Sequence, residues 1–123
     1  MVLFLTSSPY VNGADRALLS NENEFVDRIR AVLPSCPRAL FIAADPENRA
    51  GTCRFGADTV AAFAQAGIPF QSYHILDGFN AQEAEALIGQ SDLILLSGGH
   101  VPTQNAFFRE IGLRGLLEGF PGV

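Results

Sequence analysis

The stretch LILLSGGH, residues 93–100, decides the fold, because four apolar residues stop abruptly at a serine, two glycines and a histidine. An apolar run without alternation is typical of a parallel strand that is buried on both faces of a sheet. Ligands of such sheets bind just beyond the carboxyl ends of the strands. Glycines there let backbone N–H groups approach an anion or a developing oxyanion, so we expect the turn Gly98-Gly99-His100 to belong to a binding site.

Apolar runs before this stretch alternate with helical patterns along the chain. The predicted strands are residues 2–6, 39–43, 70–76 and 93–97, and the predicted helices cover about 22–33, 56–66, 80–88 and 103–111, with a short piece at 113–118. This alternation is the sequence form of βαβ units. It predicts an α/β fold of three layers (αβα) with a flavodoxin-like open parallel sheet, in a single domain of residues 1–123.

The predicted helices carry recognisable end signals. Pro34 ends the first, Gly67 is placed to adopt the left-handed conformation after the second, and Gly112 breaks the fourth. Asn80, followed three residues later by Glu83, is the pattern of a capping box before the third. The stripes expected to face the sheet are Phe25, Val26, Ile29, Val32 and Leu33; Val60, Ala61, Phe63 and Ala64; Ala84, Leu87 and Ile88; and Phe107, Phe108 and Ile111.

Composition excludes several classes of partner. A net charge of −5 with eight scattered basic residues argues against a nucleic acid or an anionic membrane surface. No apolar run approaches the ~20 residues of a membrane span, and residues 1–5 lack the flanks of a signal peptide. We therefore expect a cytoplasmic protein whose partners are small molecules or proteins. Cys36 and Cys53 are expected to be reduced.

Several familiar chemistries lack their motifs in this chain. The first predicted strand is followed neither by G-x-G-x-x-G nor by a phosphate-binding loop with its lysine, and it ends without acidic residues. His74 and His100 are far apart and have no Cys or carboxylate at metal-ligand spacing. Cys53 lacks the second glycine and the preceding strand of a nucleophile elbow. The sequence therefore predicts neither a cofactor nor a metal.

Polar or small residues follow three of the four predicted strands and would converge on one sheet edge. They are residues 6–8, Asp45 after the second strand, and residues 97–100. Asp45 precedes Pro46 and is equally explained as the cap of a turn. The competing interpretation of the two glycines is a tight turn that merely needs positive φ.

The predicted strand 93–97, the turn Gly98-Gly99-His100 and the helix start TQNAFF, residues 103–108, resemble the peptidase S51 family. Its members include dipeptidase E, an aspartyl dipeptidase, and the cyanophycinases, which share the class I glutamine amidotransferase-like fold. Residues 3–8 and 39–44 also look like the first two strands of that family. The resemblance implies a serine-type protease that hydrolyses small peptides or related amides through an acyl-enzyme. It places the backbone N–H groups of the turn in the oxyanion hole, with His100 where many members have asparagine.

The resemblance also implies a serine on an elbow after the next strand, and a later histidine that activates it. No serine follows Ser97 and no histidine follows His100, so neither residue can be placed on this chain. Residues 120–123 look like the lead into a further strand. We therefore expect residues 1–123 to be the amino-terminal part of a longer enzyme, inactive alone, with a sheet that is incomplete at its carboxyl end. The strand 93–96 would then be an open edge that invites self-association.

Two other functions remain open at this point. One is a non-catalytic or regulatory module of the same fold that holds a small anion at Gly98-Gly99, and the other is a glutamine amidotransferase-like protein with a cysteine nucleophile. An acidic substrate would demand a cationic group at the site. Arg16, Arg49 and Arg54 lie in candidate edge loops, and nothing in the sequence selects among them.

Overall fold

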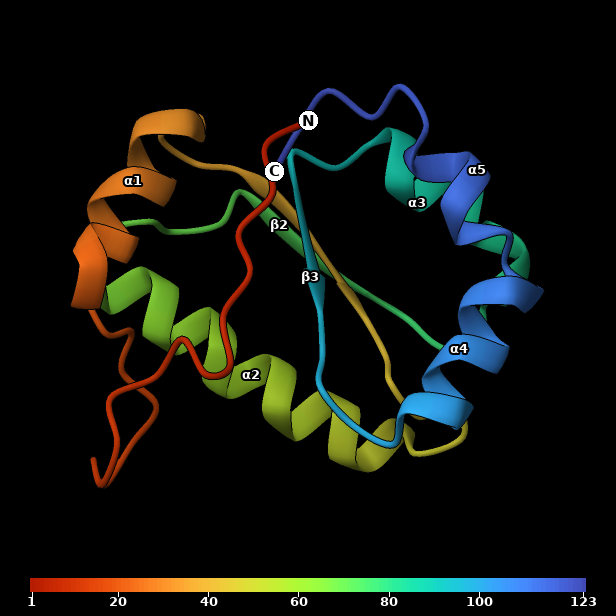
Figure 1. Ribbon diagram of the computed structural model, residues 1–123, viewed down its shortest axis with the longest axis horizontal. Coiled ribbons are helices and arrows are strands. Elements are labelled where there is room, and N and C mark those ends of the chain that lie inside the picture. Colours follow the sequence, from red (N-terminus) through yellow and green to blue (C-terminus); the bar gives the residue numbers. More distant parts are fainter.

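Three parallel strands form one open sheet in the computed structural model, which describes all 123 residues (Figure 1). They are β1 (Arg38–Ile42), β2 (Ser72–Leu76) and β3 (Leu93–Leu96), and their order is β2-β1-β3. Ala39 of the central strand lies opposite both Tyr73 and Leu93. All of β1 after its first residue is buried, which is why it reads as an unbroken apolar run.

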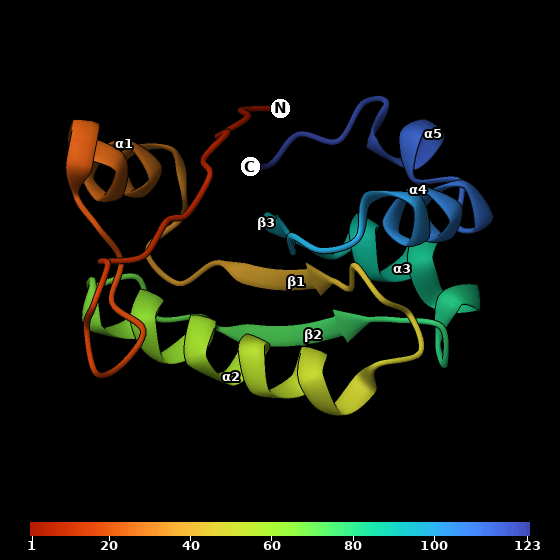
Figure 2. The same cartoon turned by 60° about the horizontal axis from the view of Figure 1, so that its bottom comes forward.

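Helices pack against both faces of this sheet, as the alternating pattern predicts. They are α1 (Phe25–Val32), α2 (Arg49–Gln65), α3 (Ala84–Gly89), α4 (Val101–Glu110) and α5 (Leu113–Leu117), with short 3-10 turns η1 (Glu22–Glu24) and η2 (Ala81–Glu83). Leu40 and Ile42 of β1 face a core built with α3, α4 and α5. Ala39 belongs to a second core with α1 and α2. Figure 2 shows α2 on one side of the sheet and α3, α4 and α5 on the other. The α/β class and the open parallel sheet are thus confirmed.

The predicted first strand, residues 2–6, does not form. This segment runs past β3 without joining the sheet, and one backbone hydrogen bond holds it, from the Val2 N–H to the Gly122 carbonyl at 3.0 Å. The N–H of Ile94 on the near edge of β3 donates instead to Val123 O, at 2.8 Å. The prediction is wrong because a strand needs a neighbour, and residues 122–123 lie where that neighbour's hydrogen bonds would form.

The second predicted helix begins earlier and buries a different stripe. It starts at Arg49 and not at residue 56, and Ala61 and Ala64 are exposed. The buried residues are mostly small or polar, namely Thr52, Gly56, Thr59, Ala62 and Phe63. A Cβ on Gly56 would lie 1.8 Å from the Tyr73 hydroxyl, so the helix lies close against β2 there. Hydrophobic periodicity misses such a stripe because its members do not look like core residues.

The predicted helix ends have mixed outcomes. Gly67 and Gly112 adopt left-handed backbones, with φ of +79° and +65°, as expected. The capping box at Asn80 does not form: its side chain accepts from the Asp77 N–H and donates to the Ile75 carbonyl, both at 2.9 Å. Helix α4 starts at Val101, two residues before the predicted position. None of the helices has the length and apolar composition needed to cross a membrane.

Candidate functional site

The strand order reverses between β1 and β3. The chain passes from β1 through α2 to β2 on one side, and then returns through α3 to β3 on the other side of β1. Open α/β sheets bind ligands in the crevice at such a reversal, beyond the carboxyl ends of the strands. Here β1 is followed by Asp45 and β3 by residues 97–100.

A cleft of about 360 Å³ lies at this reversal, and we call it the switch-point cleft. Its polar lining comes from Asp45 after β1, Asn48 and Thr52 at the start of α2, residues 97–100 after β3, and Thr103 at the start of α4. The structure thus brings together two of the three predicted strand ends. It also adds Thr103, from the predicted helix start, together with Asn48 and Thr52, which were not predicted as site residues.

Two helices begin at the switch-point cleft. The Asn48 side chain caps α2 by accepting the Gly51 N–H at 3.1 Å. His100 precedes α4 and accepts the first helical hydrogen bond, from the Gln104 N–H at 3.0 Å, but its side chain does not cap the helix. The N–H groups of Val101 and Thr103 have no acceptor in the chain. Free N–H groups and the helix dipole create positive potential at this end of α4.

The Gly98-Gly99-His100 turn presents three more backbone donors. None of its N–H groups donates to another atom of the chain. Neither glycine has positive φ, so the interpretation of a turn that needs the left-handed conformation is wrong. A Cβ on Gly99 would lie 2.7 Å from the Ala44 Cβ, whereas one on Gly98 would meet nothing within 4 Å. Gly99 is therefore required by the close approach of the turn to the end of β1.

Ser97 has a structural role in this site. Its Oγ accepts the Ala44 N–H at 2.8 Å and donates to the Ile42 carbonyl at 3.3 Å. Its own carbonyl accepts a hydrogen bond from the Gln104 side chain. The hydroxyl thus joins the end of β3 to the end of β1, and it is not free to act as a nucleophile.

The two ionisable side chains of the cleft lie on opposite strand ends. Asp45 is exposed, and its Oδ1 accepts the Glu47 N–H at 3.1 Å, which confirms that it caps a turn. It also lines the cleft, so both interpretations of this residue hold. His100 is exposed, and its Nδ1 lies 2.9 Å from the Thr103 hydroxyl. His74 lies elsewhere, on β2.

No arginine lines the switch-point cleft, including the three that were candidates for binding an acidic substrate. Arg49 is turned toward the buried Asp77, with 3.7 Å between its Nε and the carboxylate, and its guanidinium carbon lies 5.3 Å from the centre of the Phe79 ring. Arg16 and Arg54 are likewise absent from the lining. The positive potential of the cleft therefore comes from backbone N–H groups and helix ends. Cys36 and Cys53 are exposed, unpaired and outside the cleft.

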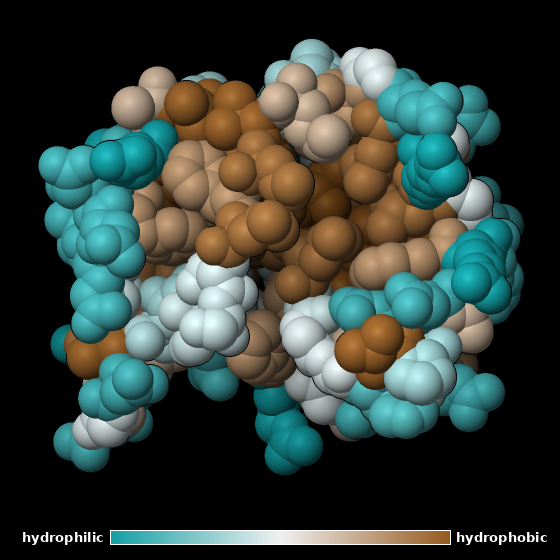
Figure 3. Space-filling view, viewed as in Figure 1, coloured by the Kyte–Doolittle hydropathy of each residue, from teal (hydrophilic) through white to brown (hydrophobic).

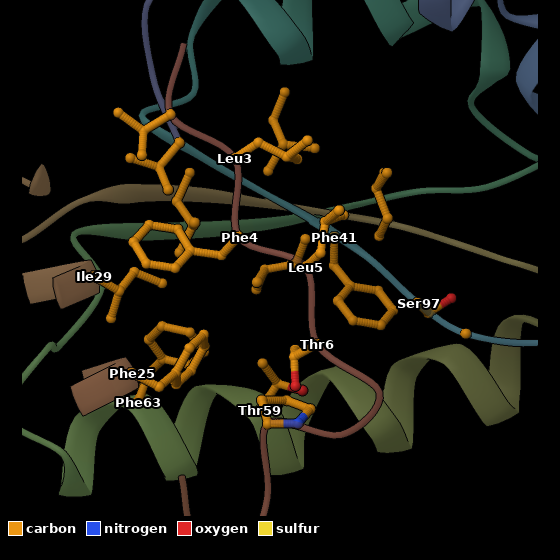
Figure 4. A pocket seen from close by; sticks show the side chains of 18 of the residues that line it. Leu3, Phe4, Leu5, Thr6, Phe25, Ile29, Phe41, Thr59, Phe63 and Ser97 are labelled. Carbon is orange, nitrogen blue, oxygen red and sulfur yellow. The ribbon is translucent and has the colours of Figure 1, made fainter. Parts of the chain in front are cut away.

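The third predicted strand end, residues 6–8, lies in a neighbouring apolar groove. This groove has a volume of about 660 Å³ and separates the amino-terminal segment from β3. It is the brown hollow in Figure 3, and Figure 4 shows Phe4 and Leu5 pointing into it from one side. Phe41, Phe55, Ser97 and Gly98 line both the groove and the switch-point cleft, so the two cavities adjoin.

Comparison with known proteins adds no relative to this description. No protein-family model, no curated protein and no solved structure matches the chain.

Proposed function

We propose that the switch-point cleft binds small peptides or amides, and that residues 1–123 carry the carbonyl-binding half of a serine hydrolase site of the peptidase S51 type. One observation carries this proposal. The N–H groups of Gly98, Gly99 and His100 have no partner in the chain and lie where the strand order reverses, beside the start of α4. Preorganised N–H donors of this kind stabilise a developing oxyanion. The class I glutamine amidotransferase-like fold is part of the same proposal.

The charges of the cleft suit a zwitterionic ligand. Asp45 provides a carboxylate on the β1 side, and the turn with the start of α4 provides N–H donors on the β3 side. An unblocked dipeptide carries an ammonium group for the carboxylate and a carbonyl or carboxylate for the donors. A simple anion would satisfy the donors but would be repelled by Asp45.

The chain has no nucleophile paired with a base in this cleft. Ser97 Oγ is engaged with the end of β1, and His100 Nδ1 is paired with Thr103. In our proposal the attacking serine and its base lie outside residues 1–123. We expect the chain alone to bind peptides without hydrolysing them.

A non-catalytic binding module is the second candidate, and the same engaged Ser97 hydroxyl favours it. The two candidates differ in what the cleft should bind most tightly. An oxyanion site is complementary to the tetrahedral transition state, so it should prefer a phosphonate analogue of the dipeptide by about tenfold or more. A simple binding module should hold the phosphonate and the dipeptide about equally. The amidotransferase alternative differs from the hydrolase only in having a cysteine in place of the serine on the elbow, and Cys36 and Cys53, which lie outside the cleft, do not fill that role.

A titration of the ¹⁵N-labelled chain tests the proposal. Alanyl-alanine, an unblocked dipeptide without a charged side chain, should shift the amide resonances of Gly98, Gly99 and His100, and its N-acetylated form should bind more weakly because it lacks the ammonium group. The substitution Gly99→Ala should weaken binding by roughly fivefold, about 1 kcal/mol. The new methyl group would collide with Ala44 and displace the turn and its N–H donors.

The matched control is Gly89→Ala, since that glycine lies in α3 with open space around its Cβ position and outside the cleft. Its binding should equal that of the unaltered chain. Amide shifts that avoid residues 98–100, or a Gly99→Ala variant that binds normally, would contradict the proposal.

A further inference from the structure

The end of β2 carries a buried carboxylate that the proposed function does not use. Asp77 follows β2 directly and is fully buried, at the same edge of the sheet as the switch-point cleft. Its Oδ1 accepts the Phe79 N–H at 2.9 Å, whereas its Oδ2 is buried without a hydrogen-bond partner. A buried carboxylate with an unbonded oxygen destabilises a fold unless a nearby charge compensates it.

Arg49, the first residue of α2, supplies the compensating charge. Its Nε lies 3.7 Å from Asp77 Oδ2, too far for a hydrogen bond, and its guanidinium carbon lies 5.3 Å from the centre of the Phe79 ring. A cation in the first turn of a helix faces the positive end of the helix dipole, which disfavours it. The pair therefore combines two unfavourable features, and an apolar pair of the same size would serve the packing as well.

The loop after β2 holds the loop after β1, which carries the acidic group of the cleft. The Gly78 N–H donates to the Pro46 carbonyl at 3.0 Å, so the two loops lie side by side (Figure 2). The Asn48 N–H donates to the Asp45 carbonyl at 3.3 Å and closes a turn whose two end residues both line the cleft. The arginine follows this turn directly, yet its contacts with the β2 loop keep it outside the cleft.

We propose that Asp77 is a positioning residue that sets the charge preference of the switch-point cleft. It holds Arg49 outside the cleft, so the Asp45 carboxylate stays free to bind the ammonium group of a dipeptide. Without the charge of Asp77, Arg49 would turn to Asp45 and neutralise it. The cleft would then accept anionic ligands as readily as zwitterionic ones. This inference rests on the proposed function, because it concerns the ligand of the same site.

A purely structural role of Asp77 would have a different effect. If the residue only stiffened the two loops, its loss would weaken every ligand of the cleft alike. Asp77→Asn separates the two roles, because asparagine has the same shape and its side-chain oxygen can still accept the Phe79 N–H. The substitution therefore removes the charge and keeps the loop.

Two ligands that differ in charge measure the preference. They are alanyl-alanine and its N-acetylated form, which lacks the ammonium group, and amide shifts of the ¹⁵N-labelled chain give both dissociation constants. We call the ratio of the two constants the selectivity. Asp77→Asn should lower the selectivity for alanyl-alanine by about fivefold, the effect of one charge pair near the surface. The double variant Asp77→Asn/Arg49→Gln should restore it, because no cation is left to neutralise Asp45.

Asp92→Asn is the matched control for the loss of a carboxylate. Asp92 also pairs with an arginine, Arg38, so the control removes an ion pair and changes the net charge by the same amount. That pair lies at the amino-terminal ends of β1 and β3, away from the cleft. The selectivity of this variant should equal that of the unaltered chain.

A second measurement needs no ligand. Nuclear Overhauser contacts between the Arg49 side chain and the Phe79 ring should be present in the unaltered chain and weaken in Asp77→Asn. Circular dichroism verifies that the variant folds. If it does not fold, Phe79→Leu decides the matter, because Phe79 is exposed and its ring is the other contact of the arginine. That variant should lower the selectivity in the same direction.

Three outcomes would overturn the inference. Equal weakening of both ligands in Asp77→Asn would indicate a structural role, and unchanged selectivity would show that Arg49 stays in place or turns to Glu47, outside the cleft. A selectivity that stays low in the double variant would exclude Arg49 as the cause. Failure of the proposed function is distinguishable, because the unaltered chain would then bind neither ligand at residues 98–100. The contact between Arg49 and Phe79 would still report whether Asp77 holds the arginine.

Discussion

Arg38, the first residue of β1, forms a bidentate ion pair with Asp92, the residue before β3. The Arg38 Nε and Nη2 atoms lie 3.0 and 2.8 Å from the two carboxylate oxygens of Asp92. The Arg38 backbone N–H adds a third hydrogen bond at 2.9 Å, and the Asp92 N–H returns one to the Arg38 carbonyl at 2.8 Å. This pair joins the two strands that frame the switch-point cleft, at the end opposite to the cleft.

The first prediction concerns the acid stability of this pair. Hydrogen bonds from Arg38 lower the pKa of the Asp92 carboxyl below its usual value, against a smaller opposing effect of burial. A lowered folded pKa stabilises the fold above the unfolded pKa of about 3.9, and this contribution is lost as the pH falls through the folded pKa. Asp92→Asn should therefore unfold at a lower urea concentration than the unaltered chain at pH 7. The difference should shrink as the pH falls below about 4.

The effect should be small, because both side chains are partly exposed to solvent. The matched control is Glu118→Gln, whose partner Arg114 lies 4.0 Å away with both side chains largely exposed, and it should change nothing. Equal urea midpoints for Asp92→Asn and the unaltered chain at pH 7 would show that the pair contributes no stability.

The second prediction compares the hydroxyl groups of Tyr73 and Tyr10. The Tyr73 hydroxyl is buried with no hydrogen-bond partner, and burial raises its pKa. The Tyr10 hydroxyl lies 2.7 Å from Thr59 Oγ1. Tyr73→Phe should raise the free energy of unfolding by about 1 kcal/mol, because it removes an unpaired polar group, and Tyr10→Phe should lower it by about 1 kcal/mol.

Urea unfolding at pH 7 measures both tyrosine variants. The raised folded pKa of Tyr73 also means that the unaltered chain should lose stability relative to Tyr73→Phe as the pH rises above about 10. A loss of stability in Tyr73→Phe at pH 7 would mean that the hydroxyl has a partner after all.

Much of the fold could be predicted because its signals are local or periodic. Residues 39–42 of β1 and all of β3 are unbroken apolar runs, and Gly67 and Gly112 have the positive φ that their positions after helices suggest. Residues 2–6 carry the same apolar signal as the strands, yet they stay outside the sheet. Strand propensity reports which face of a segment can be buried, and it does not report which backbone occupies the adjoining edge.

The candidate site was predictable where it follows from topology. Asp45 and residues 97–100 meet because parallel strands end at one edge, whatever the loops do. Hydrophobic periodicity does not reach Asn48 and Thr52, because it places the start of α2 seven residues too late, at 56 and not at 49. The sequence signal for the true start of α2 is Asn48 itself, because asparagine is a preferred residue at the amino-terminal cap of a helix. The close approach of Gly99 to Ala44 brings two loops together, and no sequence pattern in either loop predicts it.

The third prediction compares two glycines near the carboxyl end. A Cβ would meet nothing within 4 Å at either Gly112 or Gly115, but only Gly112 has a left-handed backbone. Gly115→Ala should raise the free energy of unfolding by about 0.5–1 kcal/mol through helix propensity. Gly112→Ala should lower it by about 1 kcal/mol through backbone strain. Thermal unfolding of the two variants should give midpoints on opposite sides of the unaltered chain, and a shift of both in one direction would contradict the assignment of φ.

The last prediction tests whether the Gly98-Gly99 turn depends on its approach to β1. Gly99→Ala should lower the free energy of unfolding by about 1–3 kcal/mol, because its methyl group would lie 2.7 Å from the Ala44 Cβ. Gly98→Ala has open space and ordinary φ, so it should stay within about 0.5 kcal/mol of the unaltered chain.

Removing the obstructing methyl group should rescue the Gly99 variant. In the double variant Gly99→Ala/Ala44→Gly the close contact is gone, so its destabilisation should be smaller than the sum of the two single effects. Urea unfolding of the four chains of this cycle measures the coupling. Simple additivity would show that residue 99 is constrained by something other than Ala44.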